Sequence, residues 1–105
     1  MRNSLLFFVT VPTMEVGKKI AKILVENKFA ACVNIIPGIY SIYEWKDKIE
    51  EDEELLLIIK TTEKKSEKLI QKVLDLHPYE TPECIGFKIE KGSENYLKWI
   101  SEIVD

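Results

Sequence analysis

The segment from His77 to Glu83 carries side chains that could bind a metal ion. His77 is the only histidine of the chain, and Glu80 and Glu83 follow it on a loop that Pro78 and Pro82 stiffen. An imidazole nitrogen and carboxylate oxygens suit a divalent transition metal. The spacing matches no self-sufficient metal motif, and a histidine at the end of a helix often caps the terminal carbonyl groups instead. Both interpretations remain open from the residues alone.

A second acidic set occupies the run from Glu50 to Glu54. Side chains of a strand alternate between its two faces, so these carboxylates cannot converge on one ion as the ligands of an EF-hand loop do. We therefore expect a solvated strand. Glu54, at the end of the run, and Lys60 border an apolar stretch, where they could reach a cleft or form an ion pair.

Residues typical of catalysis are sparse in this chain. Ser41 has no histidine near it in the sequence and lies in no GxSxG motif. Cys32 and Cys84 lie in apolar segments and form no CxxC pair, which favours buried free thiols. These residues therefore give little support to nucleophilic catalysis. A small hydrolase with Glu80 or Glu83 as its general base is the alternative.

Composition narrows the class of protein further. The 105 residues are 46% hydrophobic and 31% charged, with a formal net charge of -3, which indicates a soluble protein with one domain over residues 1–105. Arg2 is the only arginine, which argues against nucleic acid as a partner because phosphate and base contacts depend on basic surfaces. No apolar run is long enough to span a membrane and no signal-peptide pattern is visible, so we expect a cytoplasmic protein.

A long hairpin over residues 30–61 would position the candidate residues. Its first arm is rich in β-branched and aromatic residues. Pro37-Gly38 interrupts this arm and predicts an edge strand with a bulge, because proline cannot donate a ladder hydrogen bond. The chain should reverse at 45–48, where Asp47 tolerates a left-handed turn. The return arm ends in the apolar run 55–59, which is typical of a strand covered on both faces.

The remaining segments alternate between strand and helix patterns. Residues 5–11 form another strand that is apolar on both faces, and 84–90 alternate as a half-buried strand does. Helical spacing predicts helices over 14–28, from Thr61-Thr62 to about 76, and from 93 to the C-terminus, with Thr13 and Thr61-Thr62 as candidate caps. The resulting order predicts an α+β, ferredoxin-like βαββαβ sandwich with a protruding hairpin and a C-terminal helix, in which the first and third strands are central.

Such a subunit should associate with copies of itself. Two helices cover one face of the sheet, yet the central strands are apolar on both faces. The hairpin arms also extend past the strands that could pair with them, and exposed edges of this kind invite association. We therefore predict a closed trimeric ring. The alternative is that the C-terminal helix covers the bare face. The residues expected at the trimer interface are Ile39, Tyr40, Ile42, Tyr43 and Trp45.

Two segments resemble the signatures of the CutA divalent-cation-tolerance proteins, and the resemblance covers nearly the whole chain. The first is AACVNIIPG at 30–38, continuing through Ser41-Ile42-Tyr43, Trp45, Leu55-Leu56 and Lys60-Thr61; the second is HPYE at 77–80, with Pro82-Glu83, Tyr96-Leu97 and Trp99. The resemblance implies a ferredoxin-like subunit, a very stable homotrimer, a cytoplasmic location and tolerance of copper and other divalent metals, without an established enzymatic activity.

A set of site residues follows from the residues and the resemblance together. We expect metal to be bound weakly by His77, Glu80 and Glu54, with copper as the expected ion and no tightly bound cofactor. Some metal-binding relatives have a cysteine where this chain has Val9 and a second histidine where it has Leu76. The cleft between subunits should be lined by those three ligands and by Lys60, Tyr79, Glu83 and Trp45.

Asp47 is a further departure, since it stands where the hairpin tip of the family usually has glycine. The alternative function is a trimeric signalling or scaffold module that resembles the PII regulators. Its clefts would bind a small metabolite or a partner protein.

Overall fold

A computed structural model describes residues 3–105; Met1 and Arg2, the only arginine, lie outside the described residues. Within this range the elements are β1 (Ser4–Val11), α1 (Met14–Glu26), β2 (Cys32–Trp45), β3 (Lys48–Thr62), α2 (Glu63–Leu76), β4 (Cys84–Lys88) and α3 (Glu94–Val104). The order is the predicted ferredoxin-like arrangement with one added helix. The last strand ends at Lys88, two residues before the predicted boundary.

The sheet has the strand order β2-β3-β1-β4, and all its pairs are antiparallel. The two strands that are apolar on both faces, β1 and β3, therefore lie in the middle, as predicted. Edge strand β2 has an irregular register between Ile36 and Ile39. Gly38 has a positive φ of 81° there, a conformation that glycine adopts without steric cost. The predicted bulge at Pro37-Gly38 is confirmed.

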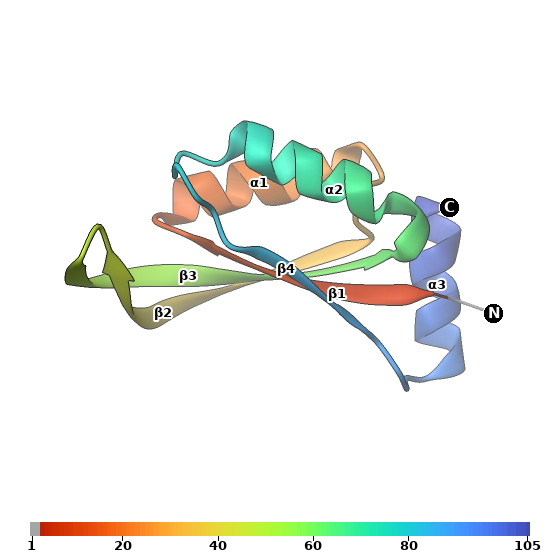
Figure 1. The fold of residues 1–105 in the computed structure, drawn as a ribbon. Coiled ribbons are helices and arrows are strands. Elements are labelled where there is room, and N and C mark those ends of the chain that lie inside the picture. Colours follow the sequence, from red (N-terminus) through yellow and green to blue (C-terminus); the bar gives the residue numbers. More distant parts are fainter. Residues whose placement is uncertain (1–2) are drawn as a thin grey trace.

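The β2-β3 hairpin extends well beyond the rest of the sheet. β1 pairs with β3 only as far as Val11↔Leu55, whereas β2 and β3 continue together from Ile39↔Glu54 to Trp45↔Lys48. Lys46 and Asp47 close the hairpin with φ values of 51° and 66°. A two-residue hairpin loop of this kind needs positive φ at both positions. Asp47 thus takes the left-handed conformation expected of it, and the tip projects away from the helices (Figure 1).

The main core lies between the sheet and helices α1 and α2, which share one face (Figure 1). Thr13 caps α1, because its Oγ1 accepts a hydrogen bond from the Val16 N–H at 3.2 Å. Thr62 occupies the N-cap position of α2, but its side chain makes no capping bond. The side-chain contacts that fill this core come from alternate strand positions and one stripe of each helix: Leu5, Phe7, Val9, Val11, Leu57, Ile59, Ile20, Leu24, Leu69 and Val73.

The opposite face of the sheet remains largely uncovered within residues 3–105. Phe87 and Ile85 of β4 are 45% and 49% exposed, and the Phe87 ring stands edge-on to Phe8 of β1 at 5.1 Å. α3 lies at the end of the sheet opposite the hairpin tip (Figure 1). It is held there by a small cluster around Ile100 and by a 2.8 Å hydrogen bond from Thr62 Oγ1 to Asp105 Oδ1. The C-terminal helix therefore covers only one end of the sheet.

Candidate functional site

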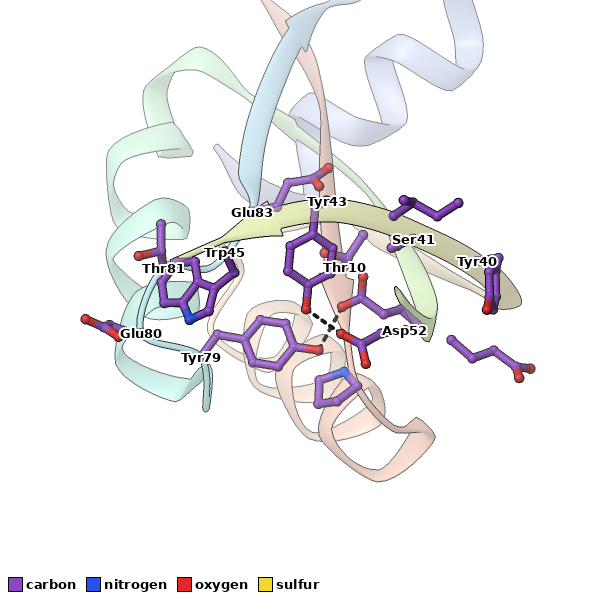
Figure 2. A pocket seen from close by; sticks show the side chains of 14 residues that line it. Thr10, Tyr40, Ser41, Tyr43, Trp45, Asp52, Tyr79, Glu80, Thr81 and Glu83 are labelled. Carbon is purple, nitrogen blue, oxygen red and sulfur yellow. Dashed lines mark hydrogen bonds between the residues drawn. The ribbon is translucent and has the colours of Figure 1, made fainter. Parts of the chain in front are cut away.

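A cleft of about 1120 Å³ lies beneath the protruding hairpin, where the α2-β4 loop passes the end of β1 (Figure 2). Three segments supply its walls: the hairpin arms beyond the reach of β1, the end of β1, and the loop that follows His77. Acidic and aromatic side chains dominate the lining, and the residues that form it include no lysine, arginine or histidine. The lining residues are Thr10, Pro12, Tyr40, Ser41, Ile42, Tyr43, Trp45, Asp52, Glu53, Glu54, Tyr79, Glu80, Thr81 and Glu83.

Tyr79 connects the loop to the hairpin through Glu54. Its hydroxyl donates a 2.7 Å hydrogen bond to Glu54 Oε2, and Glu54 is only 7% exposed. Burial, followed by this hydrogen bond to a carboxylate, raises the pKa of the Tyr79 hydroxyl. Glu54 stands one residue beyond the last pair of β1 and β3, so the loop and not a neighbouring strand supplies its donor.

Two further tyrosines bond to carboxylates on the protruding hairpin. The Tyr43 hydroxyl donates to Asp52 Oδ2, and this bond is the main reason why the pKa of Tyr43 is raised to about 12. The Tyr40 hydroxyl donates to Glu51 Oε1 at 2.9 Å, which raises its pKa as well. In Figure 2 the hydroxyls of Tyr43 and Tyr79 point toward the same central region of the cleft. Sequence reasoning missed these pairs, although both tyrosines stand opposite the acidic run in the predicted hairpin, which was a signal for them.

His77 is oriented differently from the other predicted ligands. His77 as a whole residue is 8% exposed, and it does not line the cleft. Nε2 lies 2.7 Å from the carbonyl oxygen of Thr10, and Nδ1 lies 3.2 Å from the backbone nitrogen of Tyr79. The backbone N–H of His77 bonds to the Val73 carbonyl at the end of α2, but the ring bonds to β1 and the loop. The alternative in which the imidazole caps the helix carbonyls is therefore not what the structure shows.

The predicted carboxylate ligands share the cleft without converging. Glu54, Glu80 and Glu83 all line it, but the Glu80 side chain points away from Tyr79 and Asp52 in Figure 2. Among residues 3–105, no group of three or more His, Cys, Asp or Glu side chains is arranged to hold a metal ion. The donor set suits cations in charge and atom type. The described chain alone does not form a closed coordination sphere.

The other predicted site residues divide between the cleft and distant positions. Trp45 lines the cleft, with the Lys46 ammonium 5.6 Å from its ring centre. Lys60 is not a lining residue: it stands near the other end of β3, where its Nζ donates to Asn34 Oδ1 and lies 4.0 Å from Cys32 Sγ. It forms no ion pair with Glu54, whose bond goes to Tyr79.

Val9 and Leu76, which stand where some relatives have ligands, belong to the main core. Among the predicted interface residues, Tyr40, Ile42, Tyr43 and Trp45 are all substantially exposed.

No helix among residues 3–105 has the length and apolar character needed to cross a membrane.

The comparisons with known proteins all point to the same family. The family described as CutA1 divalent ion tolerance protein matches residues 5–103. The "Divalent-cation tolerance protein CutA" of Thermus thermophilus is 50% identical over 94 residues, which are 90% of this chain and 91% of that protein. The "Protein CutA homolog" of Xenopus laevis is 55% identical over 97 residues, 92% of this chain. The chain spans 64% of that longer relative and 53% of "Protein CutA, chloroplastic" from Arabidopsis thaliana.

Solved structures agree with the sequence comparison. A divalent cation tolerance protein (Cut A1) from Thermus thermophilus has a TM-score of 0.94 and 46% identity, with 97% of this chain and 99% of that chain covered. CutA1 from Oryza sativa has a TM-score of 0.95 and 42% identity, with 99% and 95% covered. These names refer to tolerance of divalent cations and not to a catalytic activity. The chain therefore belongs to the CutA1 divalent ion tolerance protein family.

Proposed function

We propose that this protein is a non-enzymatic homotrimer of divalent-metal tolerance that binds divalent cations weakly in its clefts. The observation that carries the proposal is the charge of the cleft: Asp52, Glu53, Glu54, Glu80 and Glu83 line it, and none of its lining residues is basic. Such a surface attracts cations over a distance set by ionic strength. The names of relatives, which refer to divalent cation tolerance, support the same class of ligand.

Copper is the cation that we expect to bind most tightly. For a given set of nitrogen and oxygen donors, affinity among the first-row divalent ions rises to Cu²⁺ and falls again at Zn²⁺. Of the three metal ligands predicted from the sequence, Glu54 and Glu80 line the cleft. Asp52 adds a third carboxylate to the lining. Because these carboxylates do not converge within the described chain, binding should be weak or should require a neighbouring subunit.

The trimer is supported by the apolar surface that one subunit leaves exposed. Ile36, Ile85 and Phe87 lie on the uncovered face of the sheet, and each is more than 40% exposed. The hairpin overhang adds Tyr40 and Ile42, which are 63% and 65% exposed. Surfaces of this kind are typical of association sites. A closed ring would cover both regions at once, and it would place residues of a second subunit near each cleft.

Calorimetric titration with CuCl₂ and ZnCl₂, on protein without an affinity tag, tests the cation site. We expect Glu54→Gln and Glu80→Gln each to weaken copper binding by about tenfold or more, since each removes a charged ligand. Glu67→Gln is the matched control, because Glu67 is an exposed glutamate of α2 outside the cleft. Equal affinity in all three variants would refute binding in the cleft.

The same experiment separates the proposal from the PII-like alternative. A metabolite-binding or scaffold module would keep its copper affinity in the glutamine variants but lose binding of its own ligand when cleft aromatics such as Tyr79 are changed. The cytoplasmic location stays a prediction. The names of two relatives give other compartments for those proteins, chloroplastic in Arabidopsis thaliana and periplasmic in Archaeoglobus fulgidus.

A further inference from the structure

Both ring nitrogens of His77 form hydrogen bonds within the protein. The Thr10 carbonyl oxygen can only accept a hydrogen bond, so Nε2, 2.7 Å away, must carry the proton. The Tyr79 backbone N–H can only donate, so Nδ1, 3.2 Å from that nitrogen, must present its lone pair. These two contacts define a neutral imidazole with its proton on Nε2. Neither nitrogen then has a free lone pair to offer a metal ion.

The contact with Tyr79 N–H has the form of a local turn. It links residue 77 to residue 79, the spacing at which asparagine and aspartate side chains stabilise Asx-turns. Pro78 has no N–H, so Tyr79 supplies the first backbone donor after the histidine. The rings of His77 and Tyr79 also lie against each other, with centres 4.7 Å apart. Backbone and ring of Tyr79 are thus both oriented by His77.

This orientation decides where the Tyr79 hydroxyl goes. The Tyr79 side chain reaches Glu54 on β3, so hydrogen bonds connect Thr10 through His77 and Tyr79 to Glu54. We infer that His77 is a positioning residue that holds Tyr79 against Glu54 in the cleft, and is not itself a metal ligand. The inference rests on the proposed function only in taking this cleft as the cation site.

Ring nitrogen NMR tests the inference directly, because His77 is the only histidine and its signals are unambiguous in protein without a tag. In ¹⁵N-labelled protein we expect the tautomer with the proton on Nε2 and an Nδ1 signal typical of a hydrogen-bonded lone pair. Both signals should stay in place when ZnCl₂ is added to saturation, since zinc is diamagnetic and would move a coordinated nitrogen. A large shift of either ring nitrogen on zinc addition would overturn the inference.

Three substitutions separate positioning from ligation. His77→Asn places a carbonyl oxygen where Nδ1 stands and preserves the turn to Tyr79, His77→Gln places an amide donor near the position of Nε2, and His77→Ala removes both contacts. We expect His77→Asn to retain the nuclear Overhauser contacts between the Tyr79 ring and the Glu54 side chain, and to keep zinc affinity within about threefold, whereas loss of a direct ligand would cost about tenfold or more. These contacts report proximity, so they are read independently of the shift changes that follow from loss of the adjacent imidazole ring. His77→Ala should weaken the Tyr79–Glu54 contacts, with His77→Gln between the two.

Two results would contradict the positioning role. One is a His77→Asn variant with unchanged Tyr79–Glu54 contacts and about tenfold weaker zinc binding or worse. The other is a His77→Ala variant in which the Tyr79–Glu54 contacts persist at wild-type strength. Failure of the proposed function looks different: zinc affinity would be insensitive to Glu54→Gln, while the tautomer and the Tyr79–Glu54 contacts would still behave as expected for a positioning residue.

Discussion

The hydroxyl of Tyr79 donates a 2.7 Å hydrogen bond to Oε2 of Glu54 and so joins the α2-β4 loop to the central strand β3. The two residues are 25 positions apart in the sequence. Glu54 is a nearly buried carboxylate beyond the last pair of β1 and β3, and Tyr79 is the hydrogen-bond donor that the structure gives it. A buried carboxylate needs such donors because it has lost most of its water. This contact therefore matters both for the geometry of the cleft and for the stability of the fold.

Tyr79→Phe should therefore destabilise the protein more than the loss of one hydroxyl on the surface would. Removing the donor leaves Glu54 nearly buried without its bond, which costs about 1–3 kcal/mol. Guanidinium unfolding at fixed protein concentration measures the change, since association contributes to stability. Ser101→Ala is the control, because it removes a hydroxyl with a solvent-exposed bond to Asp105, away from the hairpin. Equal midpoints for the two variants would show that the Glu54 contact is not special.

All four tyrosines should ionise late in the folded protein. Hydrogen bonds to carboxylates or burial raise the pKa of Tyr40, Tyr79 and Tyr96, and that of Tyr43 to about 12. We expect little tyrosinate absorbance at pH 10 in native buffer and roughly half ionisation at that pH in denaturant, where the ordinary value of about 10 applies. A tyrosine that titrates near pH 10 in the folded state would disagree with these hydrogen bonds.

The sign of the linked stability change follows from the same shifts. A raised pKa in the folded state means that folding favours the protonated phenol. For Tyr43 the contribution to stability is complete below pH 10 and is lost as the pH rises to about 12. The free energy of unfolding should fall across that interval, and Tyr43→Phe should flatten part of the fall relative to wild type.

Cys84 should resist alkylation in the folded protein. Burial, with a smaller effect of the Glu83 carboxylate, raises the pKa of its thiol from 9.0 to about 11. With a pKa of about 11 in place of 9.0, the reactive thiolate fraction at pH 8 is lower by about a hundredfold. Iodoacetamide labelling followed by peptide mass analysis distinguishes Cys84 from Cys32, and labelling in denaturant gives the unprotected rate. Labelling of Cys84 at that unprotected rate without denaturant would contradict the burial.

The strands and turns were predictable because their causes are local. A strand that is apolar on both faces must be interior, which placed β1 and β3, and a proline without an N–H placed β2 at the edge. The hairpin tip followed from Asp47, whose φ of 66° is one that aspartate tolerates.

The direction of the site side chains was not predictable in the same way. The partner of His77 is the Thr10 carbonyl, 67 residues away, and the hydroxyl of Thr62 bonds to Asp105 and not to its own helix. Lys60 and Glu54 border the same apolar run, yet one faces Asn34 and the other Tyr79. Such choices depend on how elements approach one another, which periodicity does not encode. Sequence patterns assigned these residues to strands and loops, and tertiary contacts decided which of them share a cleft.

The uncovered face of the sheet gives the sharpest test of assembly. Phe87 is 45% exposed on that face, and Leu74 is equally exposed on α2, outside it. If copies of the chain cover the sheet face, Phe87→Asp buries a charge at the contact and should disrupt association, whereas Leu74→Asp should not. Sedimentation velocity at micromolar concentration should give about three times the 12.2 kDa subunit mass for wild type and Leu74→Asp. Circular dichroism confirms that Phe87→Asp still folds. A well-folded wild-type particle of 12.2 kDa would leave the aromatic face in water, and the trimer would have to be abandoned.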